Sequence, residues 1–264
     1  MGLVREVLMT KRLFFSVIIL VNFTFLGNGA FAGEMSPRTE GWTVRTISEA
    51  ELERLSERDP DLYPLAAKEI LARLNNRAYY HVGEDIRQGR PLKVPRNFSL
   101  YKNWTVLPGT IPDLVQIPKF ILLVKDNPFL GWYENGRLVR DSHVCIGRED
   151  GWTRAGIYRV LNKDKDHVSR SYTNAYGEPA PMPWALRIYE HVWIHAGDIE
   201  RGNCSHGCIN LPWFSAIDLF NWADHGTVVM IVDSAEGLQT ALARNRTNCT
   251  LYAQACERPS TRVN

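Results

Sequence analysis

The spacing of hydrophobic residues changes about 115 residues into the chain. Before that point, Leu52 with Leu55 and then the stretch LAAKEILARLNN place apolar residues at helical intervals. The segments GRPLKVPRNFSLYKNW and LPGTIPDL that follow are rich in proline and turn residues. Beyond them come short apolar runs, among them FILLVKD, HVWIHAG and TVVMIVD. The pattern predicts a small helical N-terminal region, an irregular connection and a main domain of β-strands.

Two local signals add detail to the predicted β domain. Asn135-Gly136, between flanks that carry apolar residues, is a strong signal for a two-residue hairpin turn. Pro212 at the start of PWFSAIDLFNWADHG and Gly226 just after it predict a short helix. The sequence shows neither internal repeats nor alternating βαβ units. We therefore expect a mostly antiparallel β domain with few helices, over residues 115–233, followed by a C-terminal helix and tail over 234–264.

The N-terminus has the organisation of an export signal. The basic pair Lys11-Arg12 precedes an apolar run over 13–26, and Ala30-Phe31-Ala32 supplies a small-x-small cleavage pattern. The apolar run is shorter than the roughly 20 residues that a membrane span requires. We expect a signal peptide over 1–32 and a mature protein in the periplasm, with an uncleaved anchor as the alternative.

The charge argues against two classes of partner. The full chain has a net charge of +2. Cleavage after residue 32 would remove three basic side chains and one acidic side chain, which leaves a net charge of zero. A neutral chain without a basic run is a poor nucleic-acid binder. We expect a monomer that binds neither nucleic acid nor, after cleavage, a membrane.

Five cysteines follow the predicted cleavage site: Cys145, Cys204, Cys208, Cys249 and Cys256. In an oxidising compartment, an odd number leaves at least one thiol unpaired. Cys249 and Cys256 flank six residues, and we expect them to form a short disulfide loop. Cys145 and Cys204 can pair only if the fold brings them together. Cys208 is the natural candidate for the free thiol.

The string SHGCIN places His206 two residues before Cys208, and His195 ends the predicted strand upstream. A cysteine reacts as its thiolate, so a working thiol needs an imidazole to take its proton and a third group to orient that imidazole. The end of a strand is a good platform for a base. Gly207 permits an unusual backbone angle, and the N–H groups of Gly207 and Cys208 are candidates for an oxyanion hole.

Two structural alternatives compete with catalysis. In the first, Cys208 is a small buried hydrophobe and the histidines are satisfied by the backbone. In the second, His195, Cys204, His206 and Cys208 bind zinc, although C-x-H-x-C is not a familiar zinc spacing. We therefore expect neither a metal nor another cofactor.

The segment IHAGDIERGNCSHGCINL is similar to the signature of the L,D-transpeptidase family, whose catalytic domain is called YkuD-type. That signature is a histidine at a strand end, a variable loop, then Ser/Thr-His-Gly-Cys, an apolar residue, and Arg or Asn. The NGRLV hairpin, TRAGIYRV, APMPW and the closing GTVVMIV follow in the family's order. The resemblance covers about residues 115–233 and implies a mainly β fold, a mixed or antiparallel β-sandwich with few helices.

The resemblance implies an exported cysteine enzyme that acts on bacterial peptidoglycan stem peptides in cell-wall biogenesis. By position, Cys208 matches the nucleophile and His195 the proton donor and acceptor. The remaining matches are supporting or substrate-binding positions: His206, Gly207, Ser205, Asn210, Met182 and Trp184. The acceptor can be an amine, as in a transpeptidase, or water, as in an L,D-carboxypeptidase. A thiol amidase of another family and a non-catalytic wall-binding protein are the rival readings.

The chain departs from the family pattern at several points. Only nine residues separate His195 from Ser205. Ala196 stands where some members carry a residue that holds the histidine, so we expect a backbone carbonyl to orient His195. For residues 33–114 we expect a helical cap; the alternative is a LysM-type wall-binding module, which ILARLNNRAYYHVGEDIRQGRPLKVP resembles.

Overall fold

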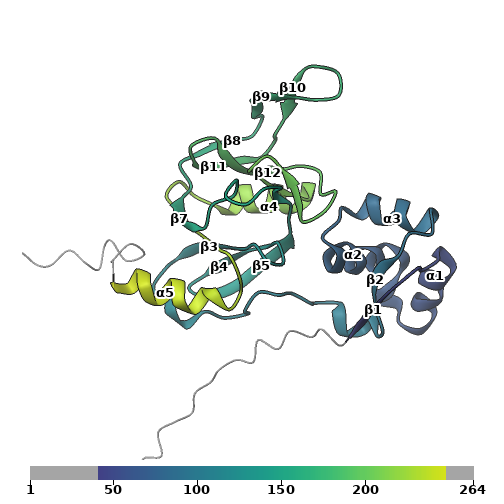
Figure 1. Ribbon diagram of the computed structural model, residues 1–264. Coiled ribbons are helices and arrows are strands. Elements are labelled where there is room, and N and C mark those ends of the chain that lie inside the picture. The colour runs from purple at the N-terminus through teal and green to yellow at the C-terminus, as the bar shows by residue number, and fades with distance from the viewer. Residues whose placement is uncertain (1–40, 248–264) are drawn as a thin grey trace, which may run out of the picture. The chain divides into compact units, whose positions relative to one another are not determined.

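The computed structural model describes residues 41–247 (Figure 1). The predicted signal peptide and the predicted Cys249–Cys256 bridge lie outside the described residues. Among the residues described, no helix is both long enough and apolar enough to cross a membrane.

The N-terminal region folds as three helices between two paired strands. Ser48 caps the first helix by accepting a hydrogen bond from the Glu51 N–H. The first and last strands pair antiparallel, with Trp42 opposite Pro95. Leu52, Leu71, Val82 and Val94 are completely buried in its core. The elements are β1 (Trp42–Arg45), α1 (Glu49–Arg58), η1 (Pro60–Leu62), α2 (Pro64–Asn75), α3 (Tyr79–Arg87) and β2 (Leu92–Pro95).

The predicted helices exist, but the connection after them is more ordered than the sequence suggested. It contains β2 and two 3₁₀ helices, η2 (Phe98–Tyr101) and η3 (Pro112–Leu114). The strand escaped sequence reasoning because its partner β1 lies some fifty residues earlier, and a four-residue strand beside prolines has little local signal.

A five-stranded sheet forms the centre of the β domain, in the order β5-β4-β3-β15-β7. Its bounds are β3 (Lys119–Val124), β4 (Phe129–Glu134), β5 (Arg137–His143), β7 (Gly156–Arg159) and β15 (Val228–Val232). The predicted hairpin is confirmed: Asn135 and Gly136 join β4 to β5 with φ values of 47° and 76°, as a two-residue turn of this kind requires.

The second large sheet has the order β14-β12-β11-β8 and packs on the first. Ile121 of β3, Ile194 of β12 and Leu219 of α4 (Trp213–Trp222) share one core. The other face of β3 packs against a second core that includes Leu238 of α5 (Gly237–Thr247), the yellow helix in Figure 1. Burial on both faces explains the continuous apolar run of β3. The bounds are β8 (Asn162–Asp164), β11 (Ala185–Tyr189), β12 (Val192–Ala196) and β14 (Ile209–Leu211).

Two smaller pairings complete the fold. Strands β6 (Ile146–Gly147) and β13 (Asn203–Ser205) pair in parallel, and β9 (Val168–Thr173) forms a hairpin with β10 (Pro179–Pro181) that extends from the four-stranded sheet (Figure 1). Parallel pairing also joins β3 to β15 and β12 to β14. The mainly β, mixed sandwich is therefore confirmed, with more parallel pairing than a mostly antiparallel domain would have.

Candidate active site

Strands β12 and β14 bring the two central residues of the predicted site to one face of the sheet. The strands are parallel, with Ile194 opposite Ile209 and His195 opposite Asn210. Ile194 and Ile209 point into the core, so His195 and Asn210 point to the opposite face. Cys208 immediately precedes β14 and packs on that face, against Trp193. His195 and Cys208 therefore occupy the same side of neighbouring strands.

His195 is held in the form that a base requires. Its Nδ1 lies 2.8 Å from the carbonyl oxygen of Ala196, so Nδ1 carries the proton and Nε2 is left as an acceptor. This contact confirms the expectation that a backbone carbonyl orients the ring. Burial lowers the pKa of His195 to about 4 although the hydrogen bond to Ala196 opposes that change. At neutral pH the imidazole is uncharged and free to accept a proton.

Cys208 is half-buried, and it is the free cysteine among the described residues. Its thiol donates to the carbonyl oxygen of His191, with 3.8 Å between sulfur and oxygen. Burial raises the pKa of the Cys208 thiol, and a backbone hydrogen bond at Trp193 opposes that change. At rest the Cys208 thiol and the His195 imidazole are therefore both neutral.

Hydrogen bonds from Ser205 and Thr153 fix the turn before Cys208. Ser205 Oγ donates to the carbonyl of Cys208 at 2.6 Å and accepts from the Gly207 N–H at 3.1 Å. Thr153 Oγ1 donates to the carbonyl of Gly207 at 2.8 Å. The φ of 123° at Gly207 lies in the region that glycine tolerates, and a Cβ there would meet the carbonyl oxygen of Trp152 at 2.9 Å.

This turn changes the expected oxyanion hole. The sequence suggested the N–H groups of Gly207 and Cys208 as its donors. The Gly207 N–H already donates to Ser205 at rest, so of these two only the Cys208 N–H remains a candidate. Thr153 was missed by sequence reasoning. Thr153 stands at the start of TRAGIYRV, a stretch that resembles the family, and this position is the only signal that could have found its hydroxyl.

His206 lies in a stack of aromatic rings instead of in the buried pair. Its ring stacks on Tyr172 of β9 at 4.3 Å and on Trp152 at 5.5 Å between centroids. The side chain is exposed. His206 therefore forms part of the site's rim together with the β9–β10 hairpin, a placement that suits a supporting residue.

His167 is a second residue that sequence reasoning missed. Its ring stacks on Trp193 at 3.9 Å, and its Nδ1 lies 3.0 Å from Asp164 Oδ2. It is close enough to His195 to contribute to the lowered pKa of that residue. In the polar stretch NKDKDH, nothing marks this histidine as different from a solvated one.

The structure separates the two residues singled out in APMPW. Met182 packs in the cluster of Ala185 and Trp193, against Cys208. Trp184 packs instead against the core between the sheets, with its ring edge-on to Phe220 at 5.4 Å. Its φ of 58° turns the chain between the two positions. We therefore retain Met182 as a substrate-binding candidate and do not retain Trp184.

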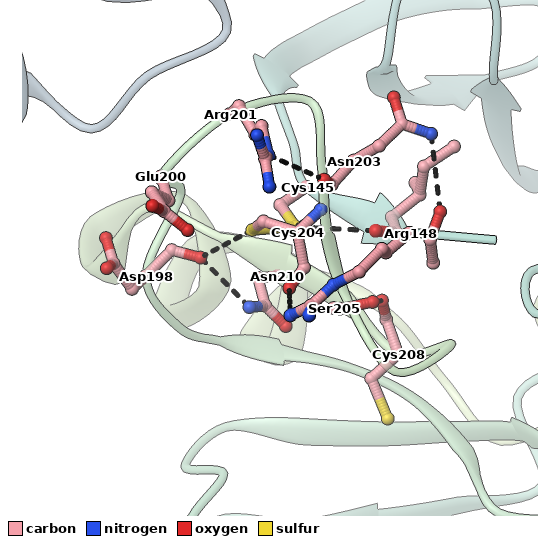
Figure 2. The surroundings of a disulfide bond; sticks show 12 residues. Cys145, Arg148, Asp198, Glu200, Arg201, Asn203, Cys204, Ser205, Cys208 and Asn210 are labelled. Atoms are coloured by element: carbon pink, nitrogen blue, oxygen red, sulfur yellow. Dashed lines mark hydrogen bonds between the residues drawn. A yellow bond between two sulfur atoms is a disulfide. The ribbon is translucent and has the colours of Figure 1, made fainter.

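A disulfide joins Cys145 to Cys204 beside the site (Figure 2). Cys145 lies between β5 and β6, and Cys204 lies in β13 directly before Ser205. The fold thus meets the condition under which these cysteines can pair. Because Cys204 is committed to this bond, it cannot be a ligand in the four-residue zinc alternative.

Part of the chain matches a known protein family. Residues 118–231 match the YkuD family, the L,D-transpeptidase catalytic domain. The chain carries a YkuD-type catalytic domain. A relative, L,D-transpeptidase 2 of Mycobacterium tuberculosis (strain CDC 1551 / Oshkosh), is 29% identical over 117 residues, which are 39% of this chain and 28% of the relative. The match thus spans little more than a quarter of that relative's length.

Solved structures align with the same part of the chain. An L,D-transpeptidase from Mycobacterium smegmatis is 21% identical, with 44% of this chain and 58% of that chain covered and a TM-score of 0.39. The catalytic domain of an E. faecium L,D-transpeptidase, acylated by ertapenem, is 28% identical, with 44% and 97% covered and a TM-score of 0.37.

Proposed function

We propose that this protein is a periplasmic L,D-transpeptidase acting on peptidoglycan. The Cys208 sulfur attacks the carbonyl that precedes the terminal D-alanine of a tetrapeptide stem, while His195 Nε2 takes the thiol proton. The carbon–nitrogen bond to D-alanine breaks, and His195 returns the proton to the departing amine. The product of this half-reaction is a thioester between Cys208 and the shortened stem.

An amine then resolves the thioester. It attacks the same carbonyl, His195 takes one of its protons, and the carbon–sulfur bond breaks to restore the thiol. Candidate acceptors are the side chain of a diaminopimelate on a neighbouring stem, a free D-amino acid, and a lysine of an anchored lipoprotein. With water as acceptor, the same site would be an L,D-carboxypeptidase.

The observation that supports this proposal best is the state of His195. A buried, neutral imidazole with Nδ1 bonded to a carbonyl has its Nε2 lone pair available, and it shares one face of the sheet with the free thiol of Cys208. A non-catalytic wall-binding protein would have no need to keep both residues, nor to hold the ring in the tautomer of a base.

The test is intact-protein mass spectrometry after incubation with disaccharide-tetrapeptide. We expect an adduct equal to the tetrapeptide donor minus D-alanine, located on Cys208, and cross-linked muropeptides in the supernatant. Cys208→Ala is the matched control and should form neither. A protein that releases D-alanine but forms only tripeptide would be a carboxypeptidase. A protein that leaves the muropeptides unchanged yet cleaves ordinary peptides or amides would contradict the proposal.

A further inference from the structure

The loop between the strand of His195 and the segment of Cys208 is held by the N-terminal region. This connecting loop is residues 197–202. The Ala78 N–H donates to the carbonyl of Ile199 at 2.7 Å, and the guanidinium of Arg77 donates to the carbonyl of Glu200. Both donors precede α3 directly. The helix therefore begins where the loop is bound.

Side chains from the first turn of α3 also contact a side chain of the connecting loop. Tyr80 donates its hydroxyl to the carboxylate of Asp198, and His81 Nε2 lies 2.9 and 3.0 Å from the two oxygens of that carboxylate. Burial, followed by the contact with Asp198, raises the pKa of Tyr80, so the phenol stays a donor across the working pH range. The Asp198 carboxylate thus contacts two neighbouring side chains of α3.

The middle and the far end of the loop are also fixed. The side chain of Ile199 is completely buried in a small cluster with Ala78 and Cys145. The disulfide to Cys145 holds Cys204 just beyond the loop (Figure 2). The N-terminal region and the disulfide therefore meet at the same few residues.

Asp198 connects this anchored loop to the site. Its carbonyl oxygen accepts a hydrogen bond from Asn210 Nδ2 at 2.9 Å (Figure 2). Asn210 is opposite His195 in the register of β12 and β14, and it lies two residues after Cys208. Its backbone N–H and carbonyl both bond to Cys145, at 2.8 and 3.0 Å. The contacts that fix Asp198 therefore also fix Asn210, which lies opposite His195 in the neighbouring strand and two residues after Cys208.

We propose that Tyr80, His81 and Asp198 are positioning residues for the His195–Cys208 pair. They act through Asn210. The N-terminal helices would then be part of the reaction's machinery although they touch neither the nucleophile nor the base. The inference rests on the proposed function only in taking Cys208 and His195 as the reacting groups. Small displacements of a catalytic group can cost a large part of the rate, so a modest loosening of this loop should be measurable.

A purely structural role for the same contacts predicts a different pattern. If they only stabilise the fold, their loss lowers the melting temperature and leaves the thiol's reactivity in the folded protein unchanged. If they act through Asn210, their loss changes the reactivity, and it does so only while Asn210 is present. A double-mutant cycle separates the two cases.

The experiment uses the full mature chain without reductant and measures the rate at which iodoacetamide alkylates Cys208, located by peptide mapping, from pH 5 to 9. The test variant is Tyr80→Phe with His81→Phe, which removes the hydroxyl and the ring nitrogens that contact Asp198 and keeps both rings. The matched control is Tyr79→Phe, an exposed tyrosine one residue earlier that makes none of these contacts. We expect the test variant to be slower by about tenfold at pH 7, with less difference at pH 9, and the control to match the wild type.

The cycle adds Asn210→Ala, alone and with the test variant. Asn210→Ala alone should be slow, and adding Tyr80→Phe with His81→Phe should cause no further loss. Additive effects would overturn the inference, as would an unchanged rate in the test variant or in Asn210→Ala alone. Alkylation requires no substrate. If Cys208 fails to react with tetrapeptide while the cycle shows coupling, the proposed function fails and this inference stands.

Discussion

Two buried neutral histidines should make the protein sensitive to mild acid. Burial lowers the pKa of His195 to about 4 and that of His143 to about 3, from an ordinary value of 6.5. His143 Nε2 lies 3.0 Å from the carbonyl of Arg77, and nearby Arg73 adds to the effect of burial. The unfolded chain binds both protons near pH 6.5, and the folded protein does not. The stability is therefore complete above pH 7 and is lost as the pH falls toward 4.

The size of the loss follows from the same values. Between pH 7 and pH 5, each histidine should lower the free energy of unfolding by about 2 kcal/mol, or about 4 kcal/mol for the pair. Carboxylates of ordinary pKa titrate mainly below this window, so they contribute little to the difference.

Urea unfolding of the oxidised protein at half-unit steps from pH 5 to 7.5 provides the assay. His143→Gln removes one titrating ring while keeping a donor for the Arg77 carbonyl, and it should remove about half of the pH dependence. His225→Gln, at an exposed position, serves as the control and should keep the wild-type slope. A wild-type slope in His143→Gln, or a stability that does not change between pH 7 and 5, would refute the reasoning.

Three further predictions follow from the site. Replacing Cys145 and Cys204 by serine opens a bridge between residues 59 positions apart and should cost up to about 4 kcal/mol of unfolding free energy, measured by urea titration; a loss below about 1 kcal/mol would contradict this. Ser205→Ala leaves the Gly207 N–H without its partner and should cost about 1–3 kcal/mol and slow acylation, whereas Ser171→Ala, on the exposed part of β9, should change neither. N-terminal sequencing of protein from the periplasm should begin at Gly33, and an intact Met1 or Met9 on membrane-bound protein would reject the signal peptide.

The sequence predicted what is encoded locally. The hairpin at Asn135-Gly136, the helix after Pro212 and the strand that carries His195 each have their own turn or periodicity signal, and all three are present, although the strand ends one residue later, at Ala196. The motif also identified Cys208 and His195 as neighbours, and the fold places them on one face.

What the sequence did not reveal depends on contacts between distant residues. Parallel pairing of β3 with β15 joins segments more than a hundred residues apart, and no local pattern encodes it. Trp184 was expected to bind substrate, but its backbone has a positive φ and its ring packs against the core between the sheets. Tyr172, His167 and Asp198 are polar or aromatic residues of ordinary appearance. Only the fold shows that Tyr172 stacks on His206, that His167 stacks on Trp193 and that Asp198 accepts a hydrogen bond from Asn210.

The most direct test of the central claim is the pH dependence of acylation in three variants, with a tetrapeptide or a β-lactam of the carbapenem type as acyl donor. Cys208→Ala should form no acyl-enzyme. His195→Ala should fold and yet acylate about 10²–10⁴-fold more slowly at neutral pH, with recovery at high pH as hydroxide replaces the base. His206→Ala removes an exposed aromatic stack. It should reduce the acylation rate less than His195→Ala does and keep the wild-type pH profile. High-pH rescue of His206→Ala, without rescue of His195→Ala, would contradict the assignment of His195 as the base.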